Sequence, residues 1–396
     1  MKVIQSYIPY NSPNKFQPLK DEMYVSMLSS LLINKHYGES NIYTNEVCKK
    51  VFNEIGIPYT NIDTEVLSKE EAKAFAMPKL KAMKAQTEPF LHLDLDSMVI
   101  EPPTFPEQPF LFSHIDQPIV KKRPKKKRLS IPNMFNHLND DGWYQLANQA
   151  YYKFISYFQQ NLSKLDFPIH HFDASTVPNM NIIKVNDVKT FSAVIEKVEK
   201  VYESIIVEYE NQAPWELSCF IEQGCIHTYL KAMSKEYQEW QIRAEDTKID
   251  THVLFKDDPV KCSFYKELKK STVTNESLPS FPLIFWHEAY CNSCHQPHSM
   301  SHTIPYEAKF KANLNLDKFK FWHVGGSNKT IAWVQAMLIG HIVKHFGVEE
   351  ALKINSWFRD DRISKGYKPT LSPGEKMYEK LSGTEIFTSN WKKTLF

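Results

Sequence analysis

Glu88-Pro-Phe-Leu-His-Leu-Asp-Leu-Asp-Ser-Met-Val-Ile100 is an apolar run that carries two aspartates near its C-terminal end, and it is the most informative segment of the sequence. Asp94 and Asp96 are two residues apart, so on an extended strand both side chains leave the same face, about 7 Å apart along the chain. Leu95 between them faces the other way. Two carboxylates this close repel each other unless a cation lies between them, and hard divalent ions prefer oxygen ligands. The spacing therefore predicts a Mn²⁺ or Mg²⁺ site at Asp94 and Asp96.

The flanks of the two aspartates are too apolar for an exposed loop. Residues 91–93 and 98–100 are typical of a buried strand in a mostly parallel sheet, and open α/β folds bind ligands at the carboxyl ends of such strands. The alternative is a strand whose exposed end carries two solvated aspartates. We therefore expect an α/β fold, with a mostly parallel central sheet flanked by helices and a ligand site where this strand ends.

Strand-like and helical segments alternate before this stretch, in a rhythm typical of a parallel sheet with covering helices. The aspartates then fall on the fourth strand, at the end of an α/β unit of nucleotide-binding size. Strands are predicted at 2–7, 41–44, after 59 and at 179–184, and helices at 21–36, 46–55, 69–84, 143–162, 187–209, around 220–223 and at 331–346.

Composition fits an enzyme-sized protein: the chain has 396 residues, of which 42% are hydrophobic and 13% aromatic, enough for one large domain or two. The formal net charge is +2, so no overall field favours nucleic acid or a membrane surface. No apolar run has transmembrane length, and the N-terminus turns polar at Gln5, so we expect neither a membrane anchor nor a signal peptide. Six cysteines are few for this length and typical of reduced thiols, which predicts a cytoplasmic protein.

Residues 101–145 lose the periodicity and carry seven prolines. In their middle, residues 121–128 form the basic run Lys-Lys-Arg-Pro-Lys-Lys-Lys-Arg. A solvated loop is the favoured interpretation of this run. A nucleic-acid contact, an import signal or a cover over an anionic substrate are the alternatives.

Cysteine and histidine are concentrated in one later segment. Its cysteine spacing at 291–295 matches covalent haem attachment in form, but that chemistry requires export, which nothing else in the sequence supports. A structural zinc site is an alternative, although a second paired motif at standard spacing is missing, so a polar loop is favoured. The residues are His287, Cys291, Cys294, His295, His298 and His302.

Phe321-Trp-His-Val-Gly-Gly-Ser-Asn-Lys-Thr330 is the second informative stretch. His323 follows an aromatic, strand-like run and offers an imidazole to a metal ion. Gly325 and Gly326 let the backbone approach a phosphate, and Lys329 offers positive charge to a diphosphate. The alternative is an ordinary Gly-Gly turn that leads into the following helix.

Glu222 and Gln223 interrupt an apolar helical segment that contains Phe220. An ionisable residue in such surroundings normally has a charged partner or a chemical role. Glu222 is therefore a candidate functional residue before any family is considered.

Taken together, the two stretches resemble a known pattern, in which Asp-x-Asp ends a strand and His-x-x-Gly-x-x-Lys follows far downstream. The chain is similar to the GT-A-fold, metal-dependent glycosyltransferases, most closely to the retaining glycogenin-like and bacterial galactosyltransferase-like group. This resemblance implies that Asp94, Asp96 and His323 bind Mn²⁺. It also implies that Gly326 and Lys329 contact the diphosphate of the donor substrate, a nucleoside-diphosphate sugar.

The resemblance further implies contacts to the two substrates. Lys79 and Lys81 lie where a basic residue of the family contacts the nucleotide or the donor sugar. Asn181 and the pair Glu222 and Gln223 correspond to its acceptor-side and donor-sugar positions, which makes Glu222 and Gln223 expected catalytic residues beside the two aspartates. The acceptor would be a glycan, a protein or another hydroxyl compound.

The resemblance implies one glycosyltransferase domain at 1–345, with insertions at about 101–145 and 240–305, and a C-terminal helical extension at 346–396. Two other classes stay open. Haloacid-dehalogenase-like phosphatases also end a strand in Asp-x-Asp, but on the first strand and with Thr or Val where Met98 stands. A zinc-containing nucleic-acid-binding protein would use the basic run and the cysteine and histidine segment, and the near-neutral net charge argues against it.

Overall fold

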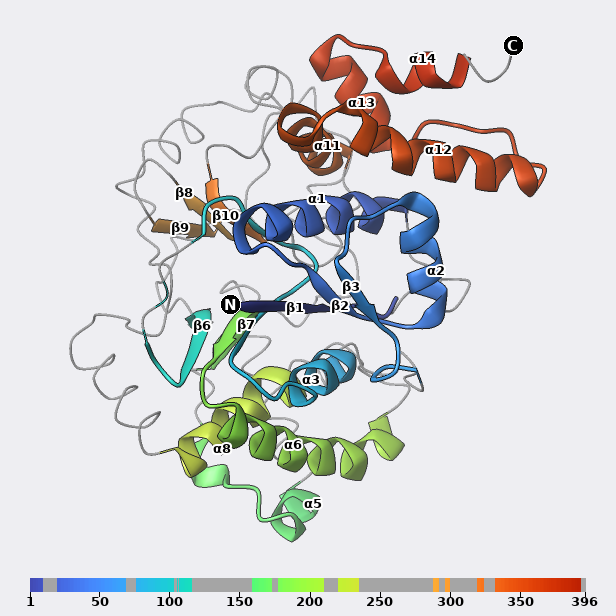
Figure 1. The fold of residues 1–396 in the computed structure, drawn as a ribbon. Coiled ribbons are helices and arrows are strands. Elements are labelled where there is room, and N and C mark those ends of the chain that lie inside the picture. Colours follow the sequence, from blue (N-terminus) through green and yellow to red (C-terminus); the bar gives the residue numbers. More distant parts are fainter. Residues whose placement is uncertain are drawn as a thin grey trace, which may run out of the picture. The chain divides into compact units, whose positions relative to one another are not determined.

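In the computed structural model of the protein, the chain forms two compact units (Figure 1). Unit 1 comprises Met1–Ser68, Leu93–Pro106 and Phe255–Phe396, and unit 2 comprises Lys69–His92 and Glu107–Leu254. The structure describes residues 1–9, 20–68, 76–102, 105, 107–115, 159–172, 177–209, 220–234, 288–291, 296–299, 319–323 and 332–392.

The predicted α/β class is confirmed, but the central sheet is mixed rather than mostly parallel. Its six strands are ordered β3-β2-β1-β4-β7-β6. The strands β1, β2 and β3 pair in parallel, whereas β6 and β7 pair antiparallel. Among the helices that the structure describes, none combines the length and the apolarity needed to cross a membrane.

Unit 1 contains the parallel strands, a second sheet and the C-terminal helices. Its elements are β1 (Lys2–Ser6), α1 (Lys20–Tyr37), β2 (Asn41–Tyr43), α2 (Glu46–Ile55), β3 (Asn61–Asp63), β5 (Ser97–Val99), β8 (Glu288–Cys291), β9 (Gln296–Ser299), β10 (Phe319–His323), α11 (Ala332–Phe346), α12 (Val348–Ser364), α13 (Pro373–Ser382) and α14 (Ile386–Lys392).

The helix predicted at 46–55 is confirmed with both ends in place as α2, because local signals fix each end. The side chain of Asn45 accepts a hydrogen bond from the amide of Cys48 (2.8 Å), which satisfies a donor that the helix leaves open. At the other end, Gly56 adopts a left-handed conformation (φ +78°) and its amide bonds back to Phe52 and Asn53.

The C-terminal helices share one hydrophobic core with α1 and α2. Met27 and Leu28 of α1 and Phe52 of α2 are fully buried in the same cluster as Leu338 of α11 and Ile354 of α12. In Figure 1, α1 accordingly lies between the parallel strands and α11. The residues expected to form a C-terminal extension thus help to bury the N-terminal helices of unit 1.

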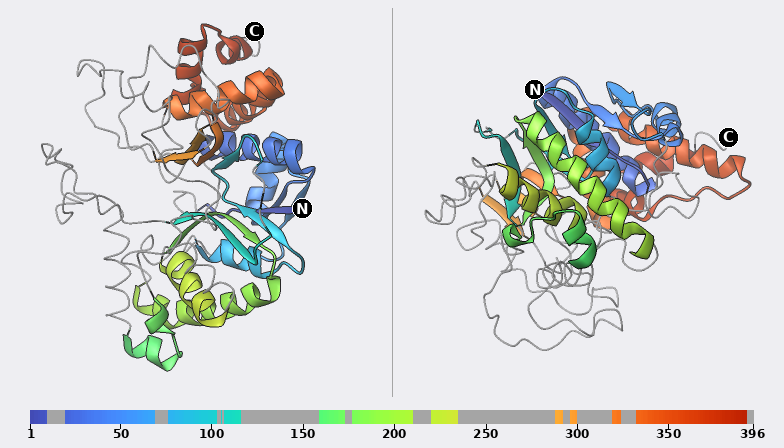
Figure 2. Two further views of the ribbon diagram at one scale, coloured as in Figure 1. Left: turned by 90° about the vertical axis from the view of Figure 1, so that its left-hand side faces the viewer. Right: turned by 90° about the horizontal axis from the view of Figure 1, so that it is seen from below.

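Unit 2 builds its core from aromatic side chains and three longer helices. Phe191 of α6 packs its ring against Phe90 (6.4 Å between centroids) and Phe110 (5.9 Å), and α6 lies beside both α3 and α8 (Figure 2). The elements are α3 (Ala76–Lys84), β4 (Phe90–Leu93, whose last residue belongs to unit 1), β6 (Phe110–Ile115), α5 (Gln159–Lys164), η1 (Ile169–His171), β7 (Pro178–Val185), α6 (Val188–Tyr209), η3 (Phe220–Cys225) and α8 (Ile226–Met233).

Gly374→Ala tests the packing of α13 on α11. A Cβ atom at position 374 would lie 2.3 Å from Cβ of Gln335 and 3.6 Å from its Cα, and neither atom can move without shifting α11. We expect the free energy of unfolding to fall by about 1–3 kcal/mol. Urea denaturation measures the change, and Lys376→Ala, on the exposed side of the same helix, is the control. Equal midpoints for the two variants would contradict this packing.

Candidate functional site

The two aspartates lie on a turn rather than on a strand. Asp94 is the first residue after β4, the chain turns at Leu95 and Asp96, and the amide of Ser97 bonds to the carbonyl of Asp94 (2.9 Å). The prediction that both carboxylates leave one strand face is therefore wrong. Leu95 is buried in the core of unit 1 and anchors the turn, while Asp94 is half-buried and Asp96 is 9% exposed.

A buried glutamine ties this turn to the first strand. The side-chain amide of Gln5, on β1, donates to the hydroxyl of Ser29 (2.8 Å) and to the carbonyl of Asp94 (3.3 Å). Gln5 is fully buried, so these bonds are shielded from water. The position of Asp94 is thus set by β1 as well as by its own strand.

The carboxyl ends of the parallel strands carry further polar groups. Just after β1, Tyr7 donates its hydroxyl to Glu22 of α1, and its carbonyl accepts from the hydroxyl of Thr44 at the end of β2 (2.6 Å). Burial and the Glu22 carboxylate raise the pKa of Tyr7 well above its usual value, so its hydroxyl stays protonated. In open α/β folds this edge of the sheet is where ligands bind.

A second strand brings His323 to the same turn. In the four-stranded sheet β5-β10-β8-β9, β10 pairs antiparallel with β5, and His323 lies opposite Ser97, the residue that follows Asp96. Directly opposed residues in such a pair have Cα atoms about 4.5–5.5 Å apart. The backbone therefore places His323 next to the turn that carries Asp94 and Asp96.

This arrangement suits a divalent cation, because two carboxylates and an imidazole can serve together as its ligands. For His323 the structure describes the backbone pairing. Among the side chains that it describes, no three His, Cys, Asp or Glu residues are grouped to hold a metal ion. Gly325, Gly326 and Lys329 follow β10 directly and lie outside the described residues.

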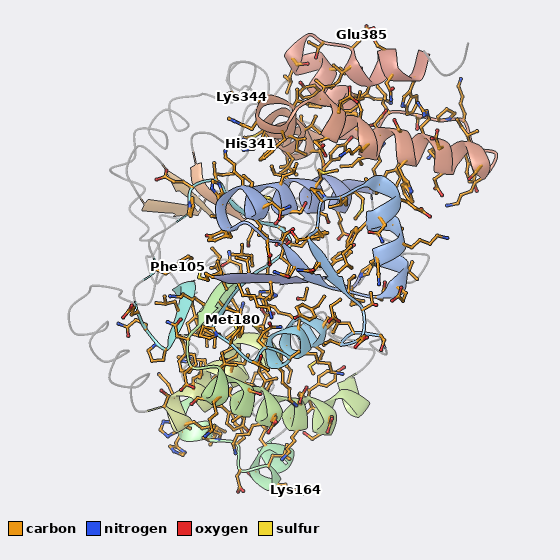
Figure 3. All side chains as sticks on the ribbon, in the orientation of Figure 1. Phe105, Lys164, Met180, His341, Lys344 and Glu385 are labelled. Carbon is orange, nitrogen blue, oxygen red and sulfur yellow. The ribbon has the colours of Figure 1, made fainter. Side chains whose placement is uncertain are left out.

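Unit 2 brings together two residues that the sequence singled out separately. The ammonium group of Lys79, on α3, lies 2.5 Å from a carboxylate oxygen of Glu222, on η3, and 2.5 Å from the carbonyl of Met180, labelled in Figure 3. Both side chains of this ion pair are only 7% exposed. The partner that Glu222 was expected to need is thus Lys79.

The remaining predicted residues of unit 2 lie on the same elements. Asn181 follows Met180 on β7 and is 2% exposed. Lys81 on α3 and Gln223 on η3 are half-buried. The predicted helix around 220–223 is a π-helical segment, η3, that continues into α8.

His92 is a buried residue to which sequence reasoning assigned no role. It is fully buried on β4, and burial together with the Lys79 ammonium holds its pKa well below the usual value. The imidazole is therefore neutral in the folded protein at neutral pH. Below about pH 6.5 the unfolded chain binds a proton that the folded chain does not, so the contribution of His92 to stability is lost as the pH falls.

The cysteine and histidine segment is described only in part. Cys291 is the last residue of β8, and His298 on β9 lies opposite Ala289 in the β8–β9 hairpin. The positions predicted at 287, 294, 295 and 302 lie outside the described residues, as does the basic run at 121–128.

Lys79→Met and Lys84→Met, both on α3, compare a buried ion pair with a more exposed one. Lys79→Met leaves the Glu222 carboxylate buried without its cation, so we expect a loss of about 3–5 kcal/mol in the free energy of unfolding. The side chain of Lys84 is 34% exposed where it pairs with Glu199, and its loss should change stability by about 0–1 kcal/mol. Guanidinium denaturation measures both, and similar losses would show that burial does not distinguish the pairs.

Comparison with known proteins identifies the family but no activity. A family model, described as a family of unknown function (DUF6734), matches residues 1–278, which include Lys79, Asp94, Asp96 and Glu222 and end before β10. No curated protein matches the chain at a significant level. Because the family match spans well over half of the sequence, the chain belongs to the DUF6734 family.

Proposed function

We propose that the protein is a metal-dependent glycosyltransferase of the GT-A type, which moves a sugar from a nucleoside-diphosphate sugar to a hydroxyl acceptor. One observation carries the proposal: β10 pairs with β5 so that His323 lies opposite the residue after Asp96. The resemblance to GT-A enzymes required these three residues to meet, although they are far apart in the sequence. A backbone pairing that brings His323 next to this turn supports a common metal site for the three residues.

In this proposal Asp94, Asp96 and His323 hold a Mn²⁺ or Mg²⁺ ion. When bound, the ion acts as a Lewis acid on the diphosphate and offsets the negative charge of the leaving group. The turn after β4 is held by Leu95 in the core and by Gln5 on β1, so the carboxylates start from a fixed backbone. Such preorganisation lowers the reorganisation that the reaction would otherwise require.

Gly325, Gly326 and Lys329 extend the proposal to the diphosphate. Gly325 follows His323 after a single residue and Lys329 is six positions beyond His323, so the same segment that supplies the imidazole also supplies these groups. The glycines would let backbone amides approach phosphate oxygens, and Lys329 would place its charge on the diphosphate. Both effects grow in importance as the sugar–phosphate bond breaks.

The resemblance to GT-A enzymes also implies contacts with the sugar substrates for Lys79, Lys81, Asn181, Glu222 and Gln223, all of which belong to unit 2. Lys79 and Glu222 form a buried ion pair, and an ammonium and a carboxylate are the kinds of donor and acceptor that bind sugar hydroxyls. Lys81, Asn181 and Gln223 lie on the same elements and would add further polar contacts.

Asp94→Asn, Asp96→Asn and His323→Gln test the metal site without a large change in side-chain volume. We expect each variant to stay folded and to lose at least about a hundredfold in Mn²⁺-dependent affinity for nucleoside diphosphates and their sugars. Titration calorimetry across a panel of uridine and guanosine nucleotides, with and without Mn²⁺, measures the affinity.

Asp63→Asn is the matched control, because Asp63 ends the parallel strand β3 of the same sheet and its carboxylate accepts hydrogen bonds from the amides of Glu65 and Val66 in the turn that follows. It should leave affinity unchanged. Wild-type affinity in an Asp94 or Asp96 variant would remove the metal assignment. Hydrolysis of phosphate esters by a wild-type protein that binds no sugar nucleotide would instead favour the phosphatase interpretation.

Lys329→Met removes a positive charge and keeps the aliphatic stem. Charge on the diphosphate grows as the bond to the sugar breaks, so kcat should fall more than KM rises, by about 2–4 kcal/mol in the activation barrier. Steady-state kinetics with the donor found by calorimetry measures both parameters, and Lys344→Met, at an exposed position of α11, is the control. A change confined to KM would mean that Lys329 only binds the ground state.

A further inference from the structure

Glu375 on α13 is a carboxylate with no exposed surface, and it lies in the part of the chain beyond the family match. Its oxygens accept hydrogen bonds from Lys20 (3.0 Å) and Tyr24 (2.7 Å) of α1 and from Asn355 of α12 (3.0 Å). It also accepts from the backbone amide of Ser372 (2.6 Å) in the capping box that begins α13. One carboxylate therefore joins three helices of unit 1.

The charge state of Glu375 follows from these partners. Burial alone would raise the pKa of this carboxyl, but the Lys20 ammonium and the hydrogen bonds from Tyr24, Asn355 and Ser372 lower it below its usual value. Compared with apolar packing, a buried ion pair adds little net stability. In some proteins such a pair instead fixes the geometry of the groups that it binds, and this is the role that we consider for Glu375.

The group that Glu375 fixes most directly is the start of α1. Lys20 is the first residue of this helix, where the helix dipole disfavours a cation, so the contact with Glu375 offsets an unfavourable position. Tyr24, one turn later, is fully buried against the same carboxylate. The first turns of α1 are thus held from the side of α12 and α13.

Contacts on the opposite side of the same helical turns connect α1 to the candidate metal centre. Glu22 of α1 accepts the hydroxyl of Tyr7 at the carboxyl end of β1. Two residues earlier on that strand, Gln5 donates to the carbonyl of Asp94. Hydrogen bonds, together with the backbone of α1 and of the β1 strand, therefore connect Glu375 to the turn that carries Asp94 and Asp96.

We propose that Glu375 is a positioning residue for the candidate site, which sets the place of Asp94 through α1 and β1. This inference rests on the proposed function where it concerns ligand binding, and on the structure alone where it concerns the order of the turn at 94–97. The proposal gives the C-terminal helices a role at a site whose aspartates lie within residues 1–278, the part of the chain that the family model matches.

Glu375→Gln and Glu379→Gln form the matched pair that tests the inference. Both residues lie on α13 and accept hydrogen bonds, but Glu379 binds the amide and hydroxyl of Thr388 at 2.8 and 2.6 Å, on α14 and away from α1. Both variants should lower the unfolding temperature by several degrees, as is usual for lost hydrogen bonds to a charged group. Only Glu375→Gln should also change the order of the turn after β4.

Hydrogen exchange of the free protein is the first readout. We expect the amides of Ser97 and Tyr7 to exchange about tenfold faster in Glu375→Gln than in the wild type, and at the wild-type rate in Glu379→Gln. Unchanged exchange in Glu375→Gln, or equal acceleration in both variants, would overturn the inference. Lys20→Gln, which removes only the contact from α1, replaces Glu375→Gln if that variant does not fold, and the same outcomes apply.

The affinity for uridine diphosphate or guanosine diphosphate with Mn²⁺ is the second readout, measured below the unfolding transition of every variant. Glu375→Gln should weaken it about tenfold or more, and Glu379→Gln should leave it unchanged. Wild-type affinity together with faster exchange would overturn the role at the site. If the wild type binds neither nucleotide, the proposed function fails, and the exchange experiment alone decides whether Glu375 positions the turn.

Discussion

Two short strands from distant parts of the chain, β5 and β10, pair antiparallel, and the candidate site depends on this pairing. The register sets which residue of β10 lies opposite Ser97, and a shift by one residue would place Trp322 there instead of His323. The partner strand is anchored on its own account, since Met98 and Val99 are fully or almost fully buried. The position of His323 beside the turn therefore depends on the core packing of β5.

The sequence predicts well those elements whose ends are fixed locally. The helix at 46–55 has an asparagine cap, an amphipathic pattern and a glycine at its end, and all three signals lie within the segment itself. The aromatic run before His323 likewise indicates a strand, which is β10 in the structure. The sequence does not indicate the turn at Asp94, because residues 94–97 alone are equally compatible with a strand. The turn is stabilised by contacts with distant residues, through Gln5 and through burial of Leu95 in the core.

The same distinction between local and distant signals holds for the polar residues. The apolar surroundings of Glu222 predicted that it needs a partner, but nothing in the sequence indicates that the partner is Lys79. For Glu375, the structure shows a capping box with Ser372, which is a contact between residues close together in the sequence. The contacts of Glu375 with Lys20 and Tyr24 join residues more than 350 positions apart. No hydrophobic periodicity or local motif in the sequence indicates such a contact.

The pairing of β5 with β10 also has a consequence for how unit 1 folds. Strands β1, β2 and β3 with their helices form from residues close together in the sequence, so this part can begin to fold as soon as it leaves the ribosome. The second sheet and the contacts of α1 with α11 and α12 must wait for residues near the end of the chain. The pairing that brings His323 next to the turn at Asp94 and Asp96 is therefore a contact between distant parts of the sequence, and contacts of this kind form more slowly than local ones.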